Sequence, residues 1–381
     1  MAEQNQQLIK ELQDSCASTL AGLKRPRTAP SSSSPPSLAD IRNDTLALLQ
    51  LVSKEVTNLS LALKPPVAQE AVKGTVEKLV DLAGKIKFAG EQLPVEGVLV
   101  KRISWTLQES LESLIHILST ASSALLAASS PTSTAAEKKK TRDSLLIATK
   151  SFWTFVERAD KLPRDELEAT RGSWKDVLGL LDDCLEEMKE MGEQDDEEEE
   201  GSDPAVRDTE DGEEEEDEDG DEDDFGASRS YNHKERARVS ATHHLLRLTR
   251  LLINRLFTRT SPSSLSTLST SFPSLAASLS APAFLSSAQR LIQQLSALGD
   301  DVAAALEPPQ RDLAETVEEL CEVADELADE VERAVEASQA NEAQPGEGGK
   351  EKAEEAGKGE KDWLAMWRKQ RDDARAKLAE I

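Results

Sequence analysis

Aromatic side chains are scarce in this chain of 381 residues: Phe, Trp and Tyr make up 3% of it, and tyrosine occurs once. A sheet protein would need more Val, Ile, Tyr and Phe, because β-branched and aromatic side chains pack best on a pleated surface. Ala, Leu, Ser and Glu are plentiful instead. The composition therefore favours helices that pack through aliphatic side chains, and the length leaves room for two domains.

Cysteine is also rare, and long apolar runs are missing. Cys16, Cys184 and Cys321 lie far apart without any CxxC pair, so we interpret them as small buried hydrophobic residues, which fits a reducing, intracellular location. The first residues, MAEQNQQLIKELQDS, lack the apolar core of a signal peptide. No stretch approaches about 18 uninterrupted apolar residues, so no membrane span is expected.

The common motifs for phosphate, dinucleotide and zinc chemistry are missing. The sequence has no GxxxxGK[ST], no strand–GxGxxG–helix unit and no HExxH. His243 and His244 are adjacent, so on a helix they point about 100° apart and do not readily share one ion. Acidic pairs such as Asp182-Asp183 fall on the wet face of a helical pattern, which indicates solvated charge rather than acid–base catalysis. We therefore predict a non-enzymatic protein without catalytic residues, cofactor or metal.

Negative charge is concentrated in one segment. The formal net charge is -28, and residues 193–224 contain 22 Asp or Glu and one Arg. The chain as a whole would be repelled by phosphate backbones, so no direct binding to nucleic acid is predicted. Three interpretations of the acidic run stay open: a solvating insert, an intramolecular clamp on the arginine-rich helix that follows, or a docking tail for a basic partner such as a histone.

Apolar residues recur at helical spacing between residues 38 and 192, without a convincing period-two segment. The clearest stripe steps by four, four, three and four residues and consists of Ile103, Leu107, Leu111, Leu114 and Leu118. Prolines such as Pro65, Pro94 and Pro163 interrupt the pattern. These features predict an antiparallel N-terminal bundle over residues 38–192, preceded over residues 1–37 by a disordered or weakly helical tail.

The second half of the chain repeats this organisation after the acidic run. We predict an acidic disordered linker over residues 193–230, because charge repulsion is high there and little can be buried. Four further helical patterns predict a C-terminal bundle over residues 231–381, with flexible loops near 260–282 and 338–360. The expected fold is therefore all-α, with two antiparallel helical bundles separated by the acidic insert.

One stretch carries a more specific pattern. Residues 151–191 read SFWTFVERADKLPRDELEATRGSWKDVLGLLDDCLEEMKEM: an aromatic pair, an LPRD turn, and an acid-spaced helix. The pattern resembles the cyclin-D-interacting protein family, also called the cyclin-D-binding proteins. The matching residues are Trp153, Leu162, Pro163, Arg164, Asp165, Asp183, Glu187 and Met188. Glu166 stands where the family favours Asn, and Asp182-Asp183-Cys184 where it favours Lys-Asp-Ala. The Ser-rich and Ala-rich composition elsewhere indicates a distant member.

The resemblance implies an all-α protein with bundles similar to those of vinculin and talin rods. It also implies a location in nucleus and cytoplasm, binding to D-type cyclins and other regulators, and restraint of cell-cycle progression. Trp153 and Trp174 are interpreted as core residues of the N-terminal bundle. Trp363 and Trp367 are candidate anchors for a partner.

The predicted function is thus that of a regulatory adaptor acting through bundle surfaces, into which a partner helix lays its apolar stripe. Two other classes stay open at this point. One is an acidic histone-binding chaperone that uses residues 193–224. The other is a cytoskeletal bundle of the vinculin type.

Overall fold

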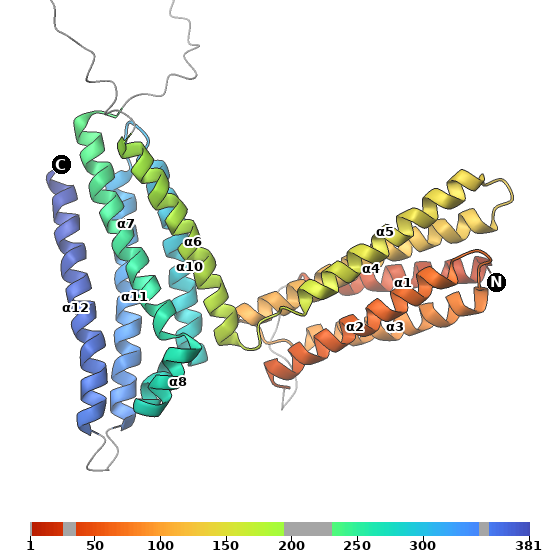
Figure 1. The fold of residues 1–381 in the computed structure, drawn as a ribbon, viewed down its shortest axis with the longest axis horizontal. Coiled ribbons are helices and arrows are strands. Elements are labelled where there is room, and N and C mark those ends of the chain that lie inside the picture. Colours follow the sequence, from red (N-terminus) through yellow and green to blue (C-terminus); the bar gives the residue numbers. More distant parts are fainter. Residues whose placement is uncertain (1, 26–35, 194–230, 343–349) are drawn as a thin grey trace, which may run out of the picture. The chain divides into compact units, whose positions relative to one another are not determined.

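The computed structural model describes residues 2–25, 36–193, 231–342 and 350–381. Every regular element within these ranges is an α-helix (Figure 1), which confirms the all-α fold class expected from the composition. The chain divides into two compact units, residues 1–170 and residues 171–381. Each unit is a helical bundle built around its own apolar side chains.

The first unit contains five helices: α1 (Ala2–Leu23), α2 (Leu38–Ala62), α3 (Gln69–Glu91), α4 (Val98–Ser129) and α5 (Ala135–Ala159). Their principal contacts form a closed ring in the order α1, α3, α2, α5, α4 and back to α1. Local sequence signals set several of the helix ends. Ser37 accepts a hydrogen bond from the Asp40 amide at the start of α2, and Thr134 forms a capping box with Glu137 at the start of α5.

The core of the first unit follows the predicted stripe on α4. Its five residues, Ile103, Leu107, Leu111, Leu114 and Leu118, are fully buried. By length and composition, α4 is also the one helix in the described ranges that is long and apolar enough to cross a membrane. One apolar face of α4 lies inside the bundle against α1 and α5, as expected for the central helix of such a unit.

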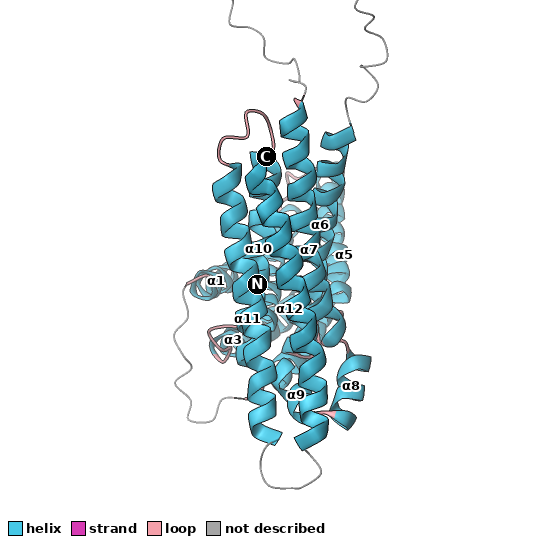
Figure 2. Ribbon diagram, turned by 90° about the vertical axis from the view of Figure 1, so that its left-hand side faces the viewer, coloured by secondary structure: helices cyan, strands magenta, loops and turns pink. Residues whose placement is uncertain are grey.

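The second unit is formed by α6 (Glu166–Glu193) from Arg171 onward, and by α7 (His233–Arg259), α8 (Pro262–Ser271), α9 (Pro273–Leu279), α10 (Pro282–Ala305), α11 (Leu313–Glu342) and α12 (Lys350–Glu380). The helix α11 packs against α10 and α12, and α12 packs against α7 (Figure 2). Hydrogen bonds tie α6 to both of its neighbours: Gln289 of α10 donates to Ser173 at 2.9 Å, and Arg250 of α7 donates to Asp182 at 2.8 Å.

The N-terminal tail and the boundary between the units differ from the sequence-based expectation. Residues 2–23 form a full helix whose Ile9 and Leu12 are buried, because α3 and α4 offer them an apolar surface. The division falls after Thr170 rather than after residue 192. The apolar face of α6, with Trp174 and Met188 fully buried, packs in the second unit.

The two expected loops of the C-terminal half also differ. Residues 260–282 were expected to form a loop from their serines and prolines, yet they contain α8 and α9 and the start of α10. Proline stands at the beginning of all three helices, where its missing amide hydrogen costs nothing. Within 338–360, residues up to 342 and from 350 onward are helical. The remainder of that range lies outside the described residues, as does the predicted acidic linker beyond Glu193.

Candidate partner-binding surfaces

The LPRD turn that carries the family pattern is held against α2 by one arginine. Arg42 donates from Nε to the Pro163 carbonyl at 2.6 Å and from its terminal nitrogen to the Leu162 carbonyl at 2.7 Å. The Pro163 side chain is buried. A guanidinium that satisfies two neighbouring carbonyls fixes the path of the chain between α5 and α6.

Arg164 and Asp165 build the start of α6. The Asp165 carboxylate accepts a hydrogen bond from the Glu168 amide at 2.8 Å, and the Glu168 carboxylate accepts one from the Arg164 amide at 2.7 Å. These bonds satisfy amide groups that have no partner within the helix. The side chains of Arg164 and Asp165 are exposed. Helix capping therefore explains the aspartate in the pattern, whereas Arg164 contributes its backbone amide.

Glu166 has a structural task that the sequence did not indicate. Its carboxylate accepts hydrogen bonds from the Val98 and Leu99 amides at the start of α4, the latter at 3.1 Å. The residue before that helix, Gly97, has a φ of 134° and no side chain with which to cap it. Glu166 thus caps α4 from a distance of 67 residues along the chain, and the departure from the family's Asn has a local function.

The two tryptophans expected in the N-terminal core behave differently. Trp153 is 43% exposed, and its ring nitrogen donates to the Thr57 hydroxyl of α2 at 3.0 Å, so its assignment to the core is corrected. Its neighbour Phe152 takes the inward position instead. Trp174 is fully buried as expected, but in the second unit.

The remaining motif residues lie on opposite faces of α6. Met188 is fully buried in the second unit, whereas Asp183 and Glu187 are exposed. The structure therefore does not bring the motif residues together into one site. It distributes them among a turn, a helix cap, a core position and a solvent-facing surface.

An open groove of about 440 Å³ lies beside the LPRD turn, between α4 and α5. Trp105 and Phe155 supply aromatic surface, and Leu162 and Pro163 close one end. Trp105 is 58% exposed, which is unusual for so large an apolar side chain. An exposed tryptophan in a groove is typical of residues that anchor a partner. We define these residues, with Arg158 and Lys161, as the Trp105 groove.

The rim of the Trp105 groove is basic. Lys161 is exposed, and Arg158 is paired with Glu109 at 2.7 Å across α4 and α5. Aromatic surface with positively charged neighbours suits a partner helix that presents an apolar side chain beside an acidic one. Trp105 was missed in the sequence because it lies two residues beyond Ile103, off the apolar stripe. A tryptophan that points away from the apolar stripe of its helix is the sequence signal that could have identified it.

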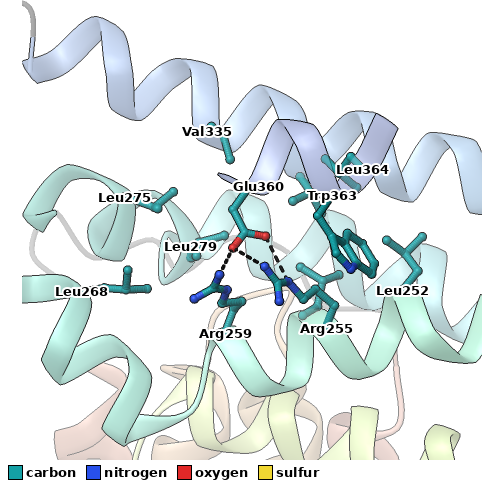
Figure 3. Close-up of a pocket in the computed structure, with 12 residues that line it drawn as sticks. Leu252, Arg255, Arg259, Leu268, Leu275, Leu279, Val335, Glu360, Trp363 and Leu364 are labelled. Carbon is teal, nitrogen blue, oxygen red and sulfur yellow. Dashed lines mark hydrogen bonds and ion pairs between the residues drawn. The ribbon is translucent and has the colours of Figure 1, made fainter. Parts of the chain in front are cut away.

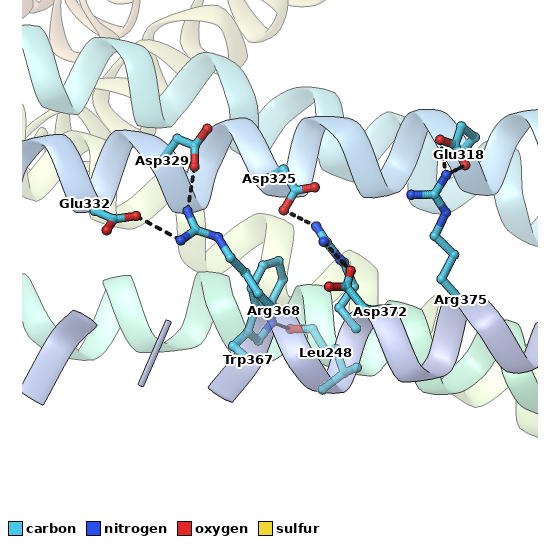
Figure 4. Close-up of polar contacts among 10 residues, drawn as sticks. Leu248, Glu318, Asp325, Asp329, Glu332, Trp367, Arg368, Asp372 and Arg375 are labelled. Atoms are coloured by element: carbon cyan, nitrogen blue, oxygen red, sulfur yellow. Dashed lines mark hydrogen bonds and ion pairs between the residues drawn. The ribbon is translucent and has the colours of Figure 1, made fainter. Parts of the chain in front are cut away.

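The candidate anchors on α12 are part of the second unit. Trp367 is 2% exposed and donates from its ring nitrogen to the Leu248 carbonyl at 2.8 Å, so its assignment as a partner anchor is corrected (Figure 4). Trp363 is half-buried, with the Arg255 guanidinium 5.2 Å above its ring. Its indole is thus already in contact with a charged group of the same unit.

A small enclosed pocket lies next to Trp363. Glu360 projects into it and pairs with Arg255 at 3.0 Å and with Arg259, as Figure 3 shows. The surrounding side chains are mostly leucine and valine. Its free volume is about 20 Å³, which accommodates about one water molecule. The pocket is therefore too small for a cofactor, and its two arginines are occupied by Glu360.

Charged contacts fasten α12 to α11. Arg368 pairs with Glu332 at 2.8 Å, Arg371 with Asp325, and Arg375 with Glu318 (Figure 4). The spacing of these arginines places them on one side of α12. This row of ion pairs identifies α12 as an integral helix of the bundle.

None of the described residues forms an evident reactive centre. Burial raises the pKa of the Cys16 and Cys184 thiols to about 12 and that of Cys321 to about 11, so all three are poor nucleophiles at neutral pH. Within the described ranges, no three His, Cys, Asp or Glu side chains converge as metal ligands.

Part of the chain matches a known protein family. Residues 44–194, from within α2 to just beyond the end of α6, match the family described as Grap2 and cyclin-D-interacting, N-terminal. The resemblance seen in the LPRD stretch is thereby confirmed over these residues. No curated protein matches the chain.

Proposed function

We propose that this chain, whose residues 44–194 carry the N-terminal region of the Grap2 and cyclin-D-interacting family, is a non-enzymatic regulatory adaptor that binds D-type cyclins or related cell-cycle regulators. The family description names cyclin D as an interaction partner of its members. Through this binding the protein restrains cell-cycle progression. It acts in the nucleus and the cytoplasm, as the family resemblance implies.

The Trp105 groove is the surface that we assign to this partner. It lies within the matched residues, it adjoins the LPRD turn, and it combines an exposed tryptophan with a basic rim. Binding hot spots are enriched in tryptophan that a partner removes from water. The occupant is a helix of the cyclin or related regulator that places an apolar side chain on Trp105 and an acidic one near Lys161.

Trp105→Ala in the full-length chain tests this assignment. Loss of a buried hot-spot tryptophan costs about 2 kcal/mol or more, so the Kd for a purified D-type cyclin should rise at least about 30-fold. The matched control is Phe88→Ala, because Phe88 is an equally exposed aromatic residue on α3, outside the groove. Titration calorimetry gives both affinities. Equal binding by the wild type and Trp105→Ala would refute the groove, and no binding by the wild type would refute the cyclin partner.

The acidic segment supports a second candidate, a histone-binding chaperone. Its 22 acidic side chains over residues 193–224 would attract a basic protein at low salt. Deleting residues 193–224 separates the two functions. An adaptor that uses the Trp105 groove keeps its cyclin after the deletion, whereas a chaperone loses histones in a pull-down.

A further inference from the structure

The helix α1 lies outside residues 44–194, which match the family, and it closes the ring of helices in the first unit. Its principal neighbours are α3 and α4. Residues 24–37, a 14-residue segment with four prolines, join it to α2. At about 3.3 Å per extended residue, such a segment spans up to about 46 Å. The connection is therefore long enough for α1 to leave its position while the other helices stay in place.

The other four helices of the unit contact one another without α1. α2 packs on α3, α4 and α5, and α4 packs on α5. α3 and α4 touch less extensively, and α1 packs against both of them. We call the surface of α3 and α4 that α1 covers the groove between these two helices. Without α1, this groove would expose apolar surface that is now covered by Ile9, Leu12, Cys16 and Leu23.

Polar contacts define the two ends of the groove. At one end, the Asn5 amide donates to the backbone carbonyl and the side-chain oxygen of Gln69, at 2.9 and 2.7 Å. At the other end, Lys24 pairs with Glu112 of α4 at 2.8 Å, with both side chains about half exposed. The groove thus recognises an amide near the start of a helix and a basic residue after its end.

Gly90 of α3 leaves the space that α1 occupies. A Cβ at this position would lie 2.3 Å from a methyl carbon of Leu23, so the end of the Leu23 side chain would have to shift and its packing on α3 would be disturbed. A Cβ at Gly84 of the same helix would meet nothing within 4 Å. The two glycines therefore form a matched pair, since both are helical but only Gly90 touches α1.

We propose that α1 is a displaceable cover, and that the groove between α3 and α4 is the docking site for an amphipathic helix of a partner protein. The occupant repeats the chemistry of α1: an amide side chain, then apolar side chains at steps of three, four and seven residues, then a basic residue. Tethering gives α1 a high effective concentration, so it holds the groove until a helix of greater affinity competes. This groove lies on a different side of α4 from the Trp105 groove, and the proposal does not depend on a cyclin partner.

The first test uses Cys16 as a reporter. Cys16 belongs to α1, and its side chain is fully buried between α1 and the rest of the unit. Burial also raises its pKa, so it should resist alkylation at pH 8 while α1 is docked. In Gly90→Ala we expect alkylation of Cys16 at least 10-fold faster than in the wild type, read by mass spectrometry. Gly84→Ala should match the wild type, and the buried Cys184 and Cys321 of the second unit should not change. Equal rates at Cys16 in all three proteins would overturn the proposal.

The second test asks whether the groove accepts a helix in trans. Ile9→Glu with Leu12→Glu in the full-length chain should release α1 and leave the groove intact. A fluorescent peptide of residues 2–24 should then bind this variant at least 10-fold more tightly than the wild type, and the same peptide with both Glu substitutions should not bind. Equal binding to both proteins, or to neither, contradicts the proposal. Loss of slow amide hydrogen exchange in α2 to α5 of the double variant also contradicts the proposal, because these four helices must stay folded when α1 is released.

Light scattering completes the test. The double variant and Gly90→Ala should have the same molar mass in solution as the wild type. A dimer that exchanges α1 between two copies would make the second copy the occupant, and it would overturn the assignment to a partner protein.

Discussion

The cap that Glu166 places on α4 can be tested by removing its carboxylate. Glu166 serves the amides of Val98 and Leu99, and Gly97 has no side chain to replace it. Losing a helix N-cap typically costs about 1 kcal/mol, and losing a negative charge at a helix start costs about 0.3–1 kcal/mol more. We therefore expect Glu166→Ala to lower the free energy of unfolding of the first unit by about 2 kcal/mol. Glu166→Gln keeps one acceptor oxygen and should lose about 1 kcal/mol.

Hydrogen exchange measured by mass spectrometry suits this prediction, because it follows each unit separately. A loss of about 2 kcal/mol accelerates exchange about 30-fold in amides that open by unfolding of the unit. We expect this acceleration for the buried centre of α4, and no change for α10 in the second unit. The melting temperature of the first unit should fall by about 4–8 °C.

The control for Glu166→Ala is Glu77→Ala. Glu77 is exposed on α3, and its pair with Lys73 is long, at 4.0 Å. Such a pair contributes less than about 0.5 kcal/mol, so exchange in α4 should stay near the wild-type rate. If the amide exchange rate of α4 in Glu166→Ala also stays within about threefold of the wild-type rate, the remote cap does not stabilise the helix and the reasoning is wrong.

Two further predictions concern the second unit. The side chain of Arg371 is 9% exposed and lies between Asp325 and Asp372, so Arg371→Ala should lower the free energy of unfolding by about 2 kcal/mol. Arg375 is half-exposed, and Arg375→Ala should lower it by less than about 1 kcal/mol in the same urea titration. Equal losses of stability would show that burial of the guanidinium does not matter. Desolvation, together with the nearby charge of Arg247, lowers the pKa of His243 in the folded protein. As the pH falls, His243 is therefore protonated in the unfolded chain before it is protonated in the folded one. The second unit should consequently lose stability as the pH falls through about 6.5. His243→Gln should flatten that pH dependence, measured by thermal unfolding between pH 5 and 8, and an unchanged slope would assign it to other groups.

Helix positions were predictable wherever the local sequence carries its own signals. The stripe from Ile103 to Leu118 predicted the buried face of α4, because positions three and four residues apart share one side of a helix. The prolines of the LPRD turn and of the Pro65 region mark breaks at the expected places. The family pattern was visible in the LPRD stretch because its residues lie close together in the sequence. Asp165, for example, caps α6 by accepting a hydrogen bond from an amide three residues further along the chain.

The candidate surfaces were less accessible to sequence reasoning. Trp153 and Phe152 are adjacent and equally apolar, and only the position of α2 decides that Phe152 turns inward. The sequence suggested that Trp367 is an exposed anchor, whereas the structure buries it in the bundle with a hydrogen bond to the Leu248 carbonyl. Glu166 gave no sign of its role, since the amides that it caps lie 67 and 68 residues away.

The sequence by itself thus determined an all-helical chain, the phase of its main apolar stripe and the family resemblance of the LPRD stretch, because each of these depends on residues within a few turns of one another. Tertiary structure decided in which unit α6 packs, whether α1 packs against other helices, and which tryptophans are exposed to solvent. The physical reason is that a marginal apolar face becomes buried only when another helix offers a complementary surface. That surface is assembled from residues that are distant in the sequence.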